Sequence, residues 1–162
     1  MLRPTDALWL ATPRELVHVL HDWRRTVVRP RILIADNHLS FLEAVTALLR
    51  PHFEVVGVAH NGEELVSETE RLSPDVLVVD ITMPVMSGID AVRTLRESGF
   101  AARVVFLTIH NEEEFLTACM AEGALGYVWK TFMRAHLIPA INSALDNTRY
   151  ISPLKFLEWP KD

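Results

Sequence analysis

The stretch that most constrains the fold is DVLVVDITMP at residues 75–84, where a run of aliphatic residues ends on Asp80 and breaks into a loop. Valine and leucine without polar alternation are typical of a parallel strand that is covered on both faces. In open α/β sheets, functional side chains gather at the carboxyl ends of such strands. The pattern therefore predicts that a buried strand carries the Asp80 carboxylate to this edge. For this residue taken alone, a solvated acid at the start of a loop is the alternative.

Strand and helix patterns alternate along residues 31–150, and this alternation predicts βαβ units around a parallel sheet. No glycine-rich dinucleotide fingerprint follows the first strand. We therefore predict an α/β, flavodoxin-like fold with a five-stranded parallel sheet in the order 2-1-3-4-5. The expected strands are 32–35, 54–59, 75–80, 103–108 and 126–130, and the expected helices are 38–50, 63–72, 88–97, 112–121 and 134–146.

Residues 1–30 stand outside this alternation as an N-terminal extension. Thr12 as an N-cap, Pro13 at the first helical position and Glu15 three residues after the cap predict an amphipathic helix over about 13–25. Its apolar face could pack on the domain or form a partner or dimer surface. Residues 151–162 are too short for another domain, so we interpret them as a tail or linker remnant.

Composition narrows the classes of protein. The chain has 162 residues, is 49% hydrophobic and carries a net charge of −5, which suits one sizeable core and argues against an electrostatic grip on nucleic acid. Cys119 is the only cysteine, so no internal disulfide can form and a reducing compartment is expected. No apolar run approaches the roughly 20 residues that span a bilayer, and no signal peptide is evident. We expect a cytoplasmic protein without a membrane partner.

Four of the predicted strands end in complementary side chains. Asp36 and Asn37 follow the first strand, Asp80 ends the third, Thr108 the fourth and Lys130 the fifth. In the predicted strand order these ends meet near one another. Taken singly, the residues have ordinary alternatives: a helix cap for the first acid, a strand end for the threonine and a solvent-directed lysine. Their coincidence at one edge favours a shared site.

The chemistry of this set matches phosphoryl transfer. A carboxylate such as Asp80 can form an acyl phosphate, and catalysis then consists largely of positioning and charge stabilisation. Mg²⁺ prefers oxygen ligands, which Asp36, Asp80 and the backbone carbonyl of Thr82 could supply. The Thr108 hydroxyl and the Lys130 ammonium could contact the phosphoryl oxygens.

The strings ILIADNH, DVLVVDITMPVMSG, VVFLT and GALGYVWK follow one another in a specific order and spacing. From about Arg31 to Ser152 the chain resembles the receiver domain of two-component response regulators, the CheY-like fold. The tail Tyr150-Ile151-Ser152-Pro153 and His110 make it most similar to the NarL/FixJ class. This resemblance implies a phosphorelay switch and not an enzyme, with a histidine kinase or phosphotransfer protein as partner and Mg²⁺ as cofactor.

The resemblance also implies roles for individual residues. Asp80 would be the phosphoacceptor, Asp36 and Asn37 the acidic-pocket positions, Thr108 the switch hydroxyl, Lys130 the phosphate-binding lysine and Tyr127 the aromatic switch residue. An ordinary strand aromatic is the alternative for Tyr127. Asn37 stands where relatives usually carry a second acid, so the affinity for Mg²⁺ should be weakened.

Other functions stay open. A phosphorylation-independent interaction module would keep the fold and use its surfaces for docking, and Asn37 keeps this alternative alive. A Mg²⁺-dependent phosphohydrolase usually needs a second aspartate two residues past the nucleophile, where this chain has Thr82. Members of the class usually continue into a helix-turn-helix domain. The chain is therefore either a stand-alone receiver or part of a longer regulator, with no direct nucleic acid binding expected and homodimerisation left open.

Overall fold

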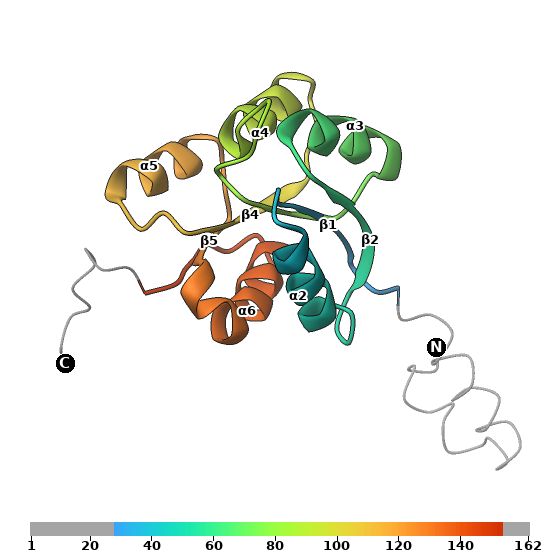
Figure 1. Ribbon diagram of the computed structural model, residues 1–162, viewed down its shortest axis with the longest axis vertical. Coiled ribbons are helices and arrows are strands. Elements are labelled where there is room, and N and C mark those ends of the chain that lie inside the picture. The colour runs from blue at the N-terminus through green and yellow to red at the C-terminus, as the bar shows by residue number, and fades with distance from the viewer. Residues whose placement is uncertain (1–27, 154–162) are drawn as a thin grey trace, which may run out of the picture.

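The computed structural model describes residues 28–153, which form a parallel sheet with helices on both faces (Figure 1). The strand order is β2-β1-β3-β4-β5-β6, and every neighbouring pair is parallel. The strands are β1 (Arg31–Ala35), β2 (Glu54–Ala59), β3 (Val76–Val79), β4 (Arg103–Thr108), β5 (Gly126–Trp129) and β6 (Tyr150–Ile151). The helices are α2 (Leu39–Leu49), α3 (Gly62–Leu72), α4 (Gly88–Glu97), α5 (Glu113–Ala121), the 3-10 turn η1 (Lys130–Phe132) and α6 (Met133–Leu145).

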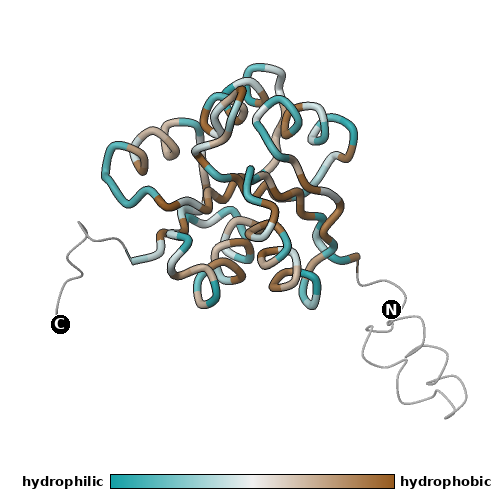
Figure 2. The backbone as a smooth tube through the Cα atoms, viewed as in Figure 1, coloured by the Kyte–Doolittle hydropathy of each residue, from teal (hydrophilic) through white to brown (hydrophobic). Residues whose placement is uncertain are grey.

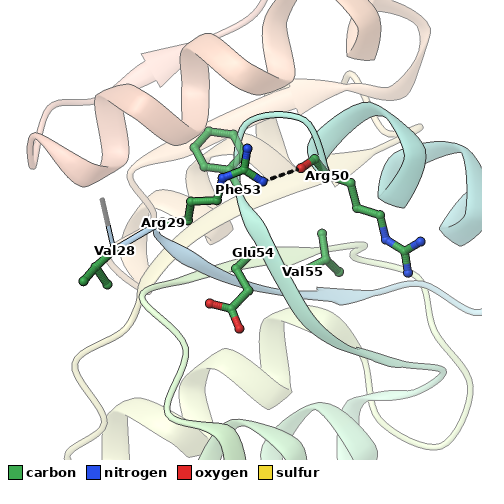
Figure 3. Close-up of a pocket in the computed structure, with 6 residues that line it drawn as sticks. All are labelled: Val28, Arg29, Arg50, Phe53, Glu54 and Val55. Carbon is green, nitrogen blue, oxygen red and sulfur yellow. Dashed lines mark hydrogen bonds between the residues drawn. The ribbon is translucent and has the colours of Figure 1, made fainter. Parts of the chain in front are cut away.

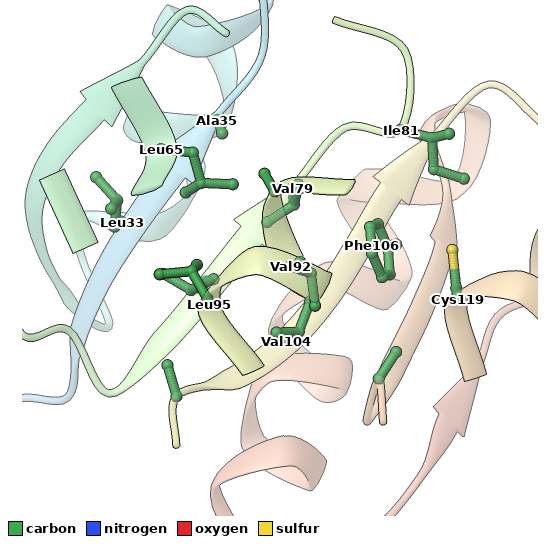
Figure 4. Close-up of a cluster of buried hydrophobic side chains, with 14 of the residues drawn as sticks. Leu33, Ala35, Leu65, Val79, Ile81, Val92, Leu95, Val104, Phe106 and Cys119 are labelled. Carbon is green, nitrogen blue, oxygen red and sulfur yellow. The ribbon is translucent and has the colours of Figure 1, made fainter. Parts of the chain in front are cut away.

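The sheet separates two hydrophobic cores. Helices α3, α4 and α5 cover one face, and α2 and α6 cover the other (Figure 1). Figure 2 shows that many of the most hydrophobic residues lie along the central strands. All four residues of β3 are buried, as expected for a strand covered on both faces. Figure 4 shows the core under α3, α4 and α5, which includes Leu33, Leu65, Val79, Val92, Leu95, Val104, Phe106 and Cys119.

The predicted fold class and the order of the first five strands are confirmed. The count of five strands was wrong, because β6 adds a short sixth strand that pairs Tyr150 with Gly126 and Ile151 with Tyr127. Two residues carry too little periodicity to predict a strand, so this pairing depends on tertiary contacts. The helix predicted over 13–25 lies outside the described residues. Within residues 28–153, no helix is long and apolar enough to cross a membrane.

Helix α4 begins very close to the end of β3. Its N-cap Ser87 accepts a hydrogen bond from the Asp90 N–H at 3.1 Å, and the Gly88 N–H donates to the Ile81 carbonyl at 2.8 Å. A Cβ atom on Gly88 would collide with the Asp80 carbonyl oxygen. Only glycine therefore allows the helix to begin directly over the strand end that carries Asp80.

Candidate functional site

Two buried carboxylates lie side by side at the carboxyl edge of the sheet. Asp36 follows β1 and Asp80 follows β3, and the two residues are 2% and 3% exposed. Their backbones continue the sheet, because the Asp80 N–H donates to the Ala35 carbonyl at 2.9 Å and the Asp36 N–H to the Ala59 carbonyl at 3.0 Å. The sheet itself therefore fixes where both acids stand.

Lys130 joins the two carboxylates. Its Nζ atom donates to Asp36 Oδ2 at 2.5 Å and to Asp80 Oδ2 at 3.0 Å, and its side chain is 11% exposed. The ammonium also lies 4.3 Å from the centroid of the Phe41 ring, a cation–π contact that the sequence did not indicate. We expected Lys130 to end the fifth strand, but β5 ends at Trp129 and Lys130 begins η1. From this turn the lysine side chain reaches both carboxylates.

The two carboxylates of the cluster share Lys130 as a positively charged partner, and this affects the pKa of Asp80. Burial raises the pKa of Asp80, Lys130 opposes that shift, and the neighbouring charge of Asp36 adds to it. Lys130 contacts the Oδ2 atom of each acid. Asp80 Oδ1 is buried and has no hydrogen-bond partner among the residues that the structure describes. A buried oxygen without a donor is costly in a resting structure and suits a group that must bind or react.

The donors at this edge fit a divalent cation. Asp36, His38 and Asp80 offer ligand atoms that all lie within 4.8 Å of one another. The unpartnered Asp80 Oδ1 is a free ligand position in this cluster. Asn37 and Thr82, both expected as ligands, lie exposed on the loops after β1 and β3. His38 was not among the expected ligands, although it stands in the ADNH string itself.

Thr108 and Tyr127 meet through the backbone of His110. Thr108 ends β4, the strand next to β3, and its Oγ1 atom accepts a hydrogen bond from the His110 N–H at 3.2 Å. Tyr127 is fully buried and donates its hydroxyl proton to the His110 carbonyl at 2.9 Å. Burial raises the pKa of Tyr127, so its hydroxyl stays protonated as a donor. The two expected switch residues therefore contact the same loop residue.

The His110 side chain ties this loop to two other segments. Its Nε2 atom lies 2.7 Å from Thr82 Oγ1 on the loop after β3, and its ring stacks on Phe115 in α5 with centroids 3.9 Å apart. The Trp129 indole N–H donates to the Ile109 carbonyl at 2.9 Å. In the sequence His110 indicates only the NarL/FixJ class, and no local pattern indicates these long-range contacts.

A hollow lies at the amino-terminal ends of β1 and β2. It has a volume of about 500 Å³ and is lined by Val28, Arg29, Arg50, Phe53, Glu54 and Val55 (Figure 3). The Arg29 guanidinium donates to the Arg50 carbonyl at 3.0 Å and to the Pro51 carbonyl at 2.8 Å. These residues flank the amino-terminal ends of β1 and β2, so the hollow is separate from the acidic cluster.

Comparisons with known proteins agree with this geometry. Residues 32–142 match the model of the response regulator receiver domain family. The transcriptional regulatory protein DegU of Brevibacillus brevis is 36% identical over 125 residues, covering 76% of this chain and 53% of that protein. The nitrate/nitrite response regulator protein NarL of Escherichia coli K12 is 34% identical over 115 residues, covering 70% and 53%. The chain thus spans about half the length of these relatives.

Solved structures give the same result. A two-component response regulator of the LuxR family from Aurantimonas sp. aligns with a TM-score of 0.73 and 34% identity, covering 77% of this chain and 91% of that one. CheY in the CheX-CheY-BeF3-Mg²⁺ complex of Borrelia burgdorferi aligns with a TM-score of 0.70 and 26% identity, covering 74% and 92%. With the predicted strand order, the clustered strand-end residues and the matched family model in agreement, the chain belongs to the response regulator receiver domain family and has the CheY-like fold.

Proposed function

We propose that Asp80 accepts a phosphoryl group from a histidine kinase or a phosphotransfer protein. The observation that carries this proposal is the buried Asp80 carboxylate, which is held by Lys130 through one oxygen and has no partner on the other. A carboxylate oxygen attacks the phosphorus of the donor, the bond from phosphorus to the donor's imidazole nitrogen breaks, and an acyl phosphate forms. Lys130 stays within reach to pair with the transferred negative charge.

A divalent cation has a clear place in this proposal. Asp36, Asp80, the Asn37 side chain and the Thr82 carbonyl would hold Mg²⁺, which supplies positive charge against the phosphoryl oxygens. Asn37 can contribute an amide oxygen but brings no charge. We therefore propose weaker Mg²⁺ binding than in a site that has two acids after the first strand.

The same geometry supports a route for the signal. In the described state, the Thr108 hydroxyl oxygen accepts the His110 N–H. A phosphoryl group on Asp80 offers new acceptor oxygens, so Thr108 turns toward it and the loop of His110 shifts. Because Tyr127 and Phe115 contact His110, the shift reaches β5 and α5. We propose that the output surface consists of α5, β5 and α6.

Incubation with acetyl phosphate and Mg²⁺, read by intact-protein mass spectrometry, tests the phosphoacceptor. We expect a mass increase of one phosphoryl group that is lost in Asp80→Asn. Asp146→Asn is the matched control, since it removes an exposed acid at the end of α6. An increase that persists in Asp80→Asn would place the phosphoryl group elsewhere, and no increase in the wild-type protein would contradict the proposal.

Asn37 favours one second candidate, a phosphorylation-independent interaction module in the cytoplasm. Size-exclusion chromatography with and without beryllofluoride separates the two. A phosphoryl-driven switch changes its elution or its binding of a partner with the mimic, whereas a constitutive module does not. The net charge of −5 supports output through protein contacts and not through nucleic acid.

A further inference from the structure

His38 precedes α2 but does not cap it with its side chain. It is the N-cap residue of α2, with φ −101° and ψ 107°, but its side chain makes no capping hydrogen bond. Its Nδ1 atom lies 3.1 Å from Asp36 Oδ1, and its backbone N–H donates to the same oxygen at 2.8 Å. The side chain is 66% exposed, so packing in the core does not explain where the ring lies. The imidazole therefore stands at the mouth of the acidic cluster.

In each of the two carboxylates, one oxygen contacts Lys130 and the other does not. Each gives its Oδ2 atom to Lys130. The Oδ1 atom of Asp36 accepts the His38 backbone N–H and lies within hydrogen-bond distance of His38 Nδ1, and the Oδ1 atom of Asp80 is buried without a hydrogen-bond partner in the described part of the chain. A cation that takes the place of the proton between His38 Nδ1 and Asp36 Oδ1 would find two carboxylate oxygens and one imidazole nitrogen that the lysine does not use.

The spacing of these atoms fits a metal ion. In octahedral coordination with bonds near 2.1 Å, neighbouring ligand atoms are about 3 Å apart and opposite ones about 4 Å. The separation of 3.1 Å between His38 Nδ1 and Asp36 Oδ1 matches neighbouring ligands. The ligand atoms of all three residues lie within 4.8 Å of one another, so small side-chain adjustments suffice.

The chemistry of the set indicates which metal. Mg²⁺ prefers oxygen ligands and high negative charge, whereas imidazole nitrogen favours first-row transition ions such as Co²⁺, Ni²⁺ and Zn²⁺. Compared with a site that has a second acid after the first strand, Asn37 brings one negative charge fewer for Mg²⁺, and His38 offers an imidazole nitrogen. We propose that His38 Nδ1 coordinates the cation together with Asp36 and Asp80, and that the site prefers a first-row transition dication to Mg²⁺. This inference rests on the proposed function, because the same Asp80 takes the phosphoryl group.

Isothermal titration with Ni²⁺ and with Mg²⁺ tests the preference. His18 and His21, one turn apart in the predicted N-terminal helix, could bind Ni²⁺ themselves, so all proteins carry His18→Gln and His21→Gln. We expect His38→Gln to lower the affinity for Ni²⁺ by about tenfold or more and the affinity for Mg²⁺ by less than about threefold. His52→Gln, which removes an exposed histidine between α2 and β2, should change neither affinity. Asn37→Asp should move the preference toward Mg²⁺.

Pulsed electron paramagnetic resonance of the Mn²⁺-loaded protein gives a direct reading of the ligand. Imidazole coordination should appear as a ¹⁴N coupling that is lost in His38→Gln and kept in His52→Gln. The inference is overturned if the ¹⁴N coupling survives in His38→Gln or if His38→Gln leaves the ratio of Ni²⁺ to Mg²⁺ affinity unchanged. It is also overturned if the protein with His38 intact binds neither ion. Phosphorylation of Asp80 by acetyl phosphate and Mg²⁺, measured on the same variants, separates the two claims. If it proceeds while the affinity ratio is unchanged, the proposed function stands and the role of His38 falls.

Discussion

Helices α5 and α6 flank β5 from opposite faces of the sheet, yet they are packed very differently (Figure 1). Helix α6 buries Leu137, Ala140, Ile141 and Ala144 fully. Helix α5 buries only Cys119 fully. Its Leu116 and Met120 pack against the core while remaining partly exposed.

The difference in burial means that the two helices are stabilised in different ways. Apolar burial stabilises α6, whereas α5 depends more on the loop before it, where His110 stacks on Phe115. Segments with few buried apolar contacts open at low free energy. On packing alone, α5 should open at a lower free energy than α6.

The largest expected effect tests the packing itself. Ile141→Ala should lower the free energy of unfolding by about 3 kcal/mol, because it leaves a cavity in a fully buried part of α6. Leu116→Ala should cost only about 1 kcal/mol, since that side chain is already partly exposed. Urea denaturation followed by circular dichroism measures both. Equal losses would end the comparison.

Removing the lysine before α6 should have the next largest effect. Lys130→Met leaves two buried carboxylates without their shared partner, so we expect a loss of about 2 kcal/mol at pH 7. The loss should shrink in acid, because burial raises the pKa of Asp80 and its protonation removes the repulsion between the two acids. Arg134→Met, at the start of α6, is the control and should change stability little. A loss independent of pH would point to packing against Phe41 in place of charge.

Asp80→Asn should act in the opposite direction. Burial raises the folded-state pKa of Asp80 above its ordinary value of 3.8, so the folded protein binds this proton more tightly than the unfolded chain. Stability therefore falls as the pH rises through the folded-state pKa, and the cost is fully present above it. The amide removes that cost, and we expect a gain of about 1 kcal/mol at pH 7 that disappears below about pH 4. A gain that is the same at both pH values would contradict the assignment.

The smallest effect should be local. His110→Ala removes the ring that contacts Thr82 and stacks on Phe115. Hydrogen exchange of the α5 amides should become about fivefold faster, as expected for the loss of about 1 kcal/mol of local contacts. The α6 amides serve as the internal reference and should keep their rates. Equal acceleration in both helices would indicate a global loss of stability.

Much of this organisation could be predicted from local patterns. The buried strand before Asp80 and the alternation of strands and helices led to the sheet order, because hydrophobic periodicity reports burial directly. The same order brought Asp36, Asp80 and Lys130 to one edge, where the structure shows them in contact. Their roles in phosphoryl transfer remain predictions.

Three of the missed features share one physical cause. The β6 pairing, the ring contact of Lys130 with Phe41 and the contacts of His110 each join residues far apart in sequence. Such contacts depend on side-chain placement in three dimensions, and no periodicity encodes them. His38 was overlooked for a different reason: a histidine at a helix start is usually unremarkable, and only its distance from Asp36 distinguishes it.

Two hydrogen bonds from β5 hold the loop after β4 and affect how this loop can move. Tyr127 and Trp129 each donate a hydrogen bond to one of two consecutive carbonyls of that loop, those of His110 and Ile109. Outward movement of the loop would break both bonds together, so small displacements should be resisted until the two give way at once. If the loop transmits the proposed signal, these two hydrogen bonds would make its response to phosphorylation cooperative.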